Sequence, residues 1–95
     1  MKTVTEKKLN QTFDITETAL KSVEIALPNH SEMEKTAKDF LQMATNYISD
    51  AKHFQQKGDF VRAFGALYYA HAWLDAGARM GIFEIKENRE LFTVD

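Results

Sequence analysis

The residues best suited to chemistry are His71 and Asp75, which are four positions apart in a segment that favours a helix. Side chains with this spacing share a helix face and can touch. A carboxylate that orients an imidazole could create a general base or a metal ligand. The simpler interpretation is a half-buried histidine satisfied by a carboxylate, because a buried polar group needs a partner. Together with Tyr68, the pair forms a candidate polar pocket.

A second polar pair, Asp50 and His53, has the acid-x-x-His spacing found in di-metal sites of helical bundles. Those sites project into the bundle, whereas His53 points away from the expected apolar face of its helix. A complete site would also need further carboxylates aimed at the same point. We therefore expect no metal, no cofactor and no catalytic residues, and we expect that the chain is not an enzyme.

Three aromatic residues, Tyr68, Tyr69 and Trp73, could stack on a nucleotide base. No cations that would hold a phosphate are apparent beside them. Packing against the C-terminal segment or against a second subunit is the preferred interpretation.

The composition limits the remaining possibilities. The 95 residues suffice for one domain, and a hydrophobic content of 44% is typical of a folded protein. The net charge is −2 and the lysines and arginines are scattered, so we expect no nucleic-acid partner. There is no cysteine, which excludes disulfides and thiolate zinc sites. The first ten residues lack the apolar core of a signal peptide, and no apolar run could span a bilayer, so we expect a cytoplasmic protein without a membrane partner.

The first part of the chain predicts an amphipathic helix over about residues 3–27. Pro28 is expected to end it, because its ring interrupts the helical hydrogen bonds. The apolar positions follow a 4-3-4-3-4 spacing, with one polar member: Leu9, Phe13, Thr16, Leu20, Val23 and Leu27.

Two further helices are predicted over about residues 32–57 and 60–80. Ser31 and Glu34 form a capping box at the start of the first of these. Gly58 and Asp59 mark the turn between the two helices, which makes them an antiparallel hairpin. Gly81 is the expected end of the last helix.

The helix over 60–80 has apolar residues nearly all the way round. Its residues 63–74 carry no formal charge. An ordinary surface helix has one apolar stripe, so a second apolar face needs its own cover. We expect the tail, residues 82–95, to be extended or irregular, with one helical turn near Asn88 and Leu91, and to pack back on the bundle. The candidate interface consists of Tyr69, Trp73, Met80 and Phe83.

Two stretches resemble a known family. They are FLQMATNYISDAKHFQQKGDFVRAF (residues 40–64) and YAHAWLDAGARMGIFEI (residues 69–85), followed by LFTVD at the end. Together they resemble the small archaeal family called domain of unknown function 357. The resemblance implies a closed, left-handed, up-and-down bundle of three helices, and it implies no activity.

The sequence thus predicts an all-α, antiparallel three-helix bundle over residues 1–95. The expected function is a non-enzymatic interaction or self-association module, in which the chain forms a homo-oligomer, most simply a dimer, or binds another protein. Two alternatives stay open. One is a small-ligand or metal-binding domain that uses His71 and Asp75, and the other is an adaptor of a nucleic-acid-processing complex.

Overall fold

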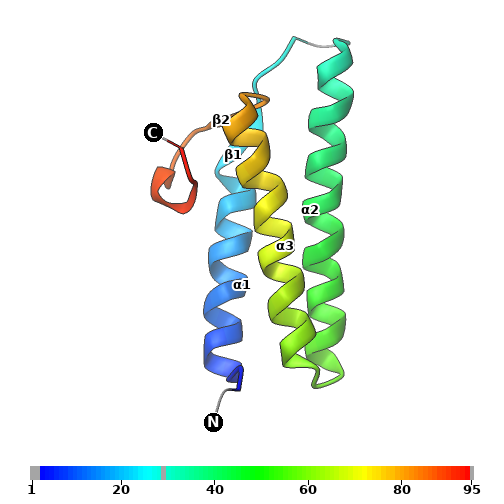
Figure 1. Ribbon diagram of the computed structural model, residues 1–95, viewed down its shortest axis with the longest axis vertical. Coiled ribbons are helices and arrows are strands. Elements are labelled where there is room, and N and C mark those ends of the chain that lie inside the picture. The colour runs from blue at the N-terminus through cyan, green and yellow to red at the C-terminus, as the bar shows by residue number, and fades with distance from the viewer. Residues whose placement is uncertain (1–2, 29, 95) are drawn as a thin grey trace.

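Three helices run alternately up and down the long axis of the molecule (Figure 1). The computed structural model describes residues 3–28 and 30–94. The elements in chain order are α1 (Glu6–Lys21), β1 (Val23–Ile25), α2 (Glu32–Gln56), α3 (Phe60–Met80), β2 (Phe83–Ile85) and the 3-10 helix η1 (Arg89–Leu91). The helical class predicted from the sequence is confirmed, and a small two-stranded sheet is added to it.

The first helix is shorter than the predicted range of residues 3–27. It ends at Lys21, well before Pro28, and Ser22 follows it with its hydroxyl donating to the Thr18 carbonyl at 2.7 Å. Val23 and Leu27 continue the helical spacing of the sequence, but the structure places neither in a helix. Helical spacing failed here because the same residues also suit a strand, in which β-branched side chains pack well.

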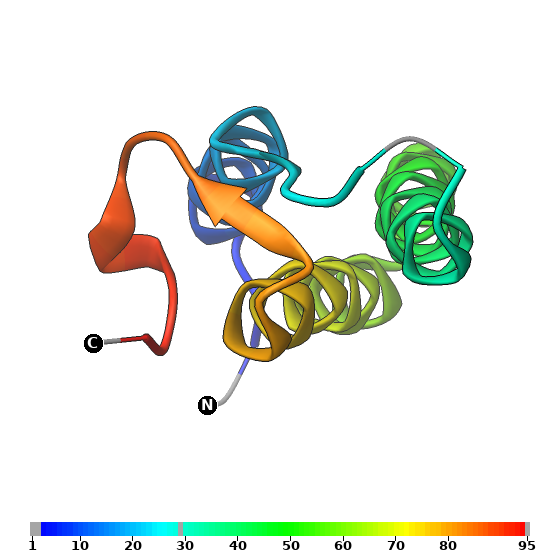
Figure 2. The same cartoon turned by 90° about the horizontal axis from the view of Figure 1, so that it is seen from above.

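The strand that replaces the end of this helix pairs with a segment near the C-terminus. β1 and β2 are antiparallel, with Val23 opposite Ile85 and Ile25 opposite Phe83. Backbone hydrogen bonds from Lys86 to Ser22 at 2.8 Å and from Ala26 to Ile82 at 3.0 Å extend the pairing at both ends. Seen from above, β2 leads from the end of α3 towards α1 (Figure 2). The sheet therefore ties the chain that leaves α1 to the chain that leaves α3.

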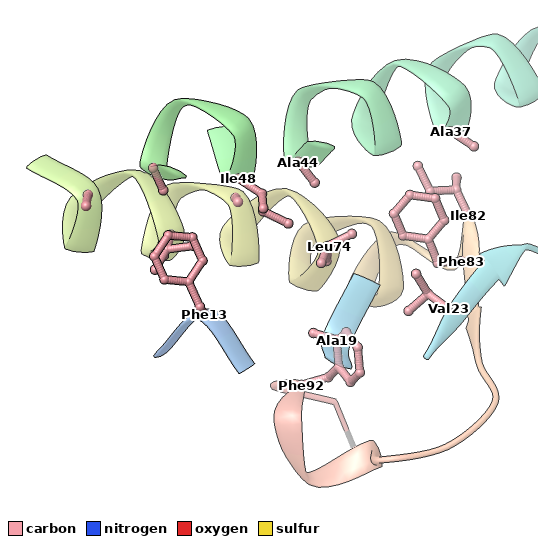
Figure 3. Packing of buried hydrophobic residues seen from close by; sticks show 14 of the residues in the cluster. Phe13, Ala19, Val23, Ala37, Ala44, Ile48, Leu74, Ile82, Phe83 and Phe92 are labelled. Atoms are coloured by element: carbon pink, nitrogen blue, oxygen red, sulfur yellow. The ribbon is translucent and has the colours of Figure 1, made fainter. Parts of the chain in front are cut away.

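The contact between α2 and α3 is built from small residues with a seven-residue repeat. The turn at residues 57–59 makes the two helices antiparallel, so the repeats on the two helices face each other. All of the repeat alanines are fully buried, and Gly77 is buried with them, as Figure 3 shows for two of the alanines beside larger core residues. Small side chains let two helices approach closely. The repeats are Ala37, Ala44 and Ala51 on α2, and Ala63, Ala70 and Gly77 on α3.

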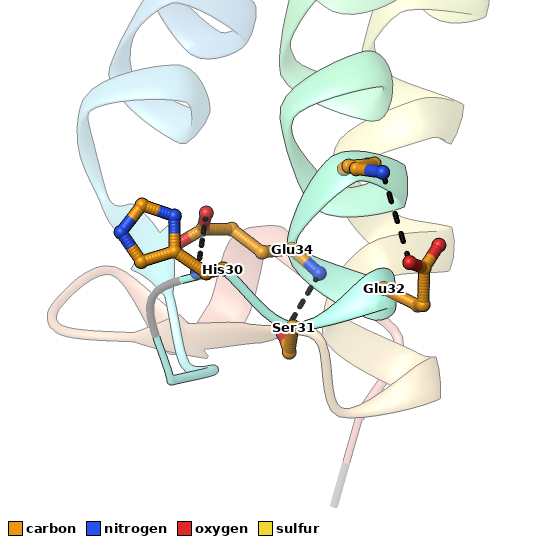
Figure 4. A network of polar contacts seen from close by, with 5 residues as sticks. His30, Ser31, Glu32 and Glu34 are labelled. Carbon is orange, nitrogen blue, oxygen red and sulfur yellow. Dashed lines mark hydrogen bonds and ion pairs between the residues drawn. The ribbon is translucent and has the colours of Figure 1, made fainter.

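Side chains cap all three long helices at their starts. Thr5, Ser31 and Asp59 accept hydrogen bonds from backbone N–H groups that have no partner inside the helix. At α2 the predicted capping box is altered. The Glu34 amide donates to the Ser31 hydroxyl at 3.1 Å, but the Glu34 carboxylate accepts from the backbone N–H of His30 rather than that of Ser31 (Figure 4).

The C-terminal tail, defined here as residues 88–94, returns along the bundle on the side away from α2 (Figure 2). Asn88 has a left-handed backbone, with φ of 56°, and its side-chain amide donates to the Ser22 hydroxyl at 3.0 Å. Phe92 is buried as part of the same hydrophobic core as Ala19 (Figure 3). The tail therefore covers the contact between α1 and α3 and does not cover the rest of α3.

Candidate functional site

Three polar side chains, one turn apart on α3, hold the C-terminal tail. His71 Nε2 lies 2.6 Å from the carbonyl oxygen of Leu91. Asp75 accepts one hydrogen bond from the backbone N–H of Thr93 at 2.7 Å and a second, short one from the Thr93 hydroxyl. Arg79 Nη1 donates to the Thr93 carbonyl at 2.7 Å. These three side chains thus act as a row of clamps on the backbone of the tail.

The candidate polar pocket is consequently filled by the chain itself. A carbonyl oxygen only accepts hydrogen bonds, so the Nε2 atom of His71 must carry a proton. Both carboxylate oxygens of Asp75 are engaged by Thr93. The side chain of Tyr68 is 56% exposed, and its ring packs edge-on against Phe64 with centroids 4.8 Å apart. The tail therefore occupies His71 Nε2 and both carboxylate oxygens of Asp75, the atoms that a ligand site at this pair would use.

The second polar pair, Asp50 and His53, lies on the exposed surface of α2. The His53 ring lies beside that of Phe54, with centroids 6.2 Å apart. Among the described residues, no group of three or more His, Cys, Asp and Glu side chains is placed to hold a metal ion.

The aromatic residues of α3 pack along one edge against α2. The rings of Tyr69 and Tyr47 have centroids 4.4 Å apart, and Trp73 meets Phe40 edge-on at 4.9 Å. Trp73 also lies 6.3 Å from Tyr69. This contact leaves Trp73 half-buried, while 48% of Tyr69 remains exposed. The two candidate interface residues are thus partly covered by α2, and the tail lies on the opposite edge of α3.

One candidate interface residue was assigned wrongly. Phe83 is only 4% exposed, and its ring occupies the space beside Gly77, where a Cβ atom would lie 2.3 Å from two ring carbons. A residue this deeply buried is not available to a partner chain. The sequence predicts only an extended or irregular segment after residue 81, and it does not show that Phe83 belongs to a strand whose inner face packs on α3.

The exposed side of α3 is a continuous surface of apolar and small residues. Its exposed fractions include 70% for Val61 and 57% for Met80. In α3, all of whose residues the structure describes, the only charged side chain between Arg62 and Arg79 is Asp75, which binds the tail. We call this surface the outer face of α3, and it consists of Val61, Gly65, Tyr69, Ala72, Ala76 and Met80.

The sequence had named Tyr69 and Met80 as interface candidates. Gly65 and Ala76 were not counted as candidates. Val61 and Ala72 were missed. The available signal was the regular spacing of exposed apolar and small positions every three or four residues, and it was hidden by the larger aromatic residues nearby.

A shallow depression lies on another side of the molecule, between α1 and α2. Leu20 and Ile48 supply apolar surface to it. The side chains of Glu17 and Lys52 also line it and form an ion pair at 3.7 Å. Both charged side chains are substantially exposed, so the pair contributes little to stability.

Comparison with known proteins identifies the family. Residues 13–83 match the family model described as Protein of unknown function (DUF357). The chain belongs to this family. No curated protein and no solved structure matches the chain.

The matched region of this DUF357 chain contains strand β1 and all of α2 and α3. The entire outer face of α3 thus lies inside the matched region, whereas the residues that follow Phe83 lie outside it. No helix among the described residues has the length and apolar character needed to cross a membrane.

Proposed function

We propose that this DUF357 chain is a non-enzymatic protein-interaction module, and that the outer face of α3 is its contact surface. The observation that carries the proposal is the exposure of this face: Tyr69 and Met80 are about half exposed and Val61 more so, with small residues between them. Contiguous apolar surface larger than a few hundred Å² on a soluble protein usually marks an interaction site.

The shape of the molecule supports this assignment. The Cα atoms extend 17 Å along the shortest axis, which is the depth of about two packed helices, since helix axes lie about 10 Å apart and Cα atoms lie about 2.3 Å from each axis. A molecule this thin has one layer of core between its helices. The core takes the side of α3 that carries Leu67, Ala70 and Leu74, and no element within residues 3–28 and 30–94 covers the opposite side.

The contacts that α3 makes with the tail and with α2 also support the outer face of α3 as the contact surface. His71, Asp75 and Arg79 secure the tail on one edge of α3, and Tyr47 and Phe40 of α2 pack on the other edge. Both flanks of the helix are therefore supported, and the surface between them is held in a fixed shape. A preformed surface loses little conformational entropy on binding.

The test is the size of the purified chain added at about 1 mM to a concentrated extract of its native host, so that a weak complex is populated. We expect the wild-type chain to elute in a species larger than one chain. Ala76→Glu places a charge in the middle of the outer face and should elute as a single chain, because burying an unpaired charge is costly. Gln11→Glu adds the same charge to the exposed surface of α1 and should elute as the wild type does. Elution of all three proteins as single chains would refute the proposal.

The closed, left-handed handedness of the bundle, which the family resemblance implies, is also a proposal. The buried core that α1, α2 and α3 share supports the closed arrangement. A crystal structure tests it directly.

A further inference from the structure

We infer that the partner of the outer face of α3 is a second copy of this chain, and that the two α3 helices pack antiparallel about a twofold axis between Ala70 and His71. This inference rests on the interaction function proposed above and specifies its partner and register. It follows from the positions of the exposed residues along the helix.

The outer face has a palindromic spacing. Its six residues are separated by four, four, three, four and four positions, so the pattern is the same from either end. At about 100° per residue, all six positions fall within an arc of roughly 100° on the helix. In an antiparallel pair of α3 helices, each residue of the outer face would lie at the same height along the helix axis as another residue of the outer face on the partner chain. The counterparts are Val61 with Met80, Gly65 with Ala76, and Tyr69 with Ala72.

The counterparts also match in size. Gly65 meets Ala76 near the centre line at both ends of the contact, where two small residues let the helix backbones approach. Tyr69 meets Ala72 near the axis, so that a large ring faces a methyl group. A self-complementary surface in which residue i meets j and j meets i is what a twofold dimer requires.

The charges at the borders are compatible with this register. Arg62 and Arg79 come to the same level in the pair. Arg62 points in the same direction as Met80, and Arg79 in the same direction as Val61, so the two arginines lie on opposite borders of the contact, at its ends. Each already has a partner of its own: Arg62 pairs with Asp59 at 3.5 Å, and Arg79 donates to the Thr93 carbonyl. Their guanidinium groups can stay in water at the ends of the contact while the apolar stems of the side chains lie along it.

The area is sufficient for a weak dimer. With the adjacent Tyr68, 56% exposed, the face leaves on the order of 500 Å² of each chain open to water. Two such faces bury about 1,000 Å², which is the lower limit for specific interfaces. We therefore expect a reversible dimer with a dissociation constant of roughly 10–500 µM.

Disulfide trapping in the purified 95-residue chain tests the register, because its sequence contains no cysteine. Two copies of residue 76 would be separated by about 16 Å along the axis, beyond the reach of a disulfide, and so would two copies of residue 65. Ala76→Cys and Gly65→Cys should therefore not crosslink when each is oxidised alone, but should crosslink when mixed. Ala72→Cys lies near the axis and should crosslink with itself.

Gln11→Cys, on the exposed surface of α1, measures crosslinking by random collision. A Cβ atom at Gly65 would meet nothing within 4 Å, so this variant should fold, and circular dichroism of each reduced variant verifies it. Self-crosslinking of every α3 variant would indicate a parallel pair and overturn the inference. The inference would also be overturned if every α3 variant, alone or mixed, crosslinked only as much as Gln11→Cys does. In that second case, a large species in host extract that Ala76→Glu abolishes would still leave the interaction function standing, with a different protein as partner.

Discussion

Two glycines in α3 have opposite roles at the scale of single residues. Both lie inside a helix, where glycine costs up to about 1 kcal/mol relative to alanine. The added Cβ would meet open space at Gly65, but at Gly77 it would lie 2.3 Å from two carbons of the Phe83 ring. Gly77 thus makes room for the ring of Phe83, through which strand β2 joins the core.

Gly77→Ala should therefore lower the free energy of unfolding, by about 1–3 kcal/mol, because the ring of Phe83 must move from a well-packed position. Urea denaturation measures this difference. The matched control is Gly65→Ala, which should raise the stability by up to about 1 kcal/mol when measured at concentrations that keep the chain monomeric. Equal effects of the two substitutions would contradict this account of Gly77.

A like-charge pair on the sheet is a second feature at this scale. Glu24 and Glu84 are directly opposite in the two strands, and both are exposed. Like charges at such positions destabilise a sheet. Lys86 relieves part of the repulsion through an ion pair with Glu24 at 3.6 Å.

Glu84→Lys should stabilise the chain by roughly 0.2–1 kcal/mol, since it converts the repulsive pair into an attractive one. Thermal unfolding at low ionic strength measures the gain, which should shrink in 1 M salt. Glu84→Gln, which only removes the repulsion, should give a smaller gain. A loss of stability in the lysine variant would show that the cross-strand repulsion is unimportant.

At the scale of elements, the second and third helices were predictable from the sequence because side chains and glycines mark their ends. Ser31 and Asp59 cap their starts, and Gly81 takes the left-handed conformation at the end of α3, with φ of 84°. The strands were not predictable. Each has three residues, too few to show a period of two, and the partner of β1 lies some sixty positions further along the chain.

The candidate site was predictable only in part, for a similar reason. The i, i+4 spacing of His71 and Asp75 correctly places them on one face of α3. It cannot show that their partners are backbone atoms of Leu91 and Thr93, because those contacts depend on how the tail folds back after β2. Which residues of α3 are exposed likewise depends on which sides of α3 pack against α1 and α2.

The tail gives a prediction at the element scale. Asp75→Ala removes the acceptor for both hydrogen bonds of Thr93, so it should lower the free energy of unfolding by about 1–2 kcal/mol. Hydrogen exchange at the Thr93 amide should accelerate more than exchange in α2. Asp75→Asn keeps one carbonyl acceptor and should have a smaller effect on both. If hydrogen exchange at the Thr93 amide is unchanged in Asp75→Ala, the hydrogen bonds between Asp75 and Thr93 do not form in solution.

At the scale of the whole molecule, the three helices make a thin rod whose third helix contributes to the core with one side only. The tail and α2 support its borders, and the outer face stays open to water. A palindromic face of this kind is completed most simply by a copy of itself. The central claim of this account is therefore that the isolated chain dimerises through α3.

Sedimentation equilibrium of the purified chain from about 10 µM to 1 mM tests that claim most directly, since this range spans the expected dissociation constant. We predict that the average mass of the wild type rises from one chain towards two, that Gln11→Glu behaves identically, and that Ala76→Glu keeps the mass of one chain throughout. A wild-type chain that remains monomeric at 1 mM, or an Ala76→Glu variant that dimerises as well as the wild type, would contradict it.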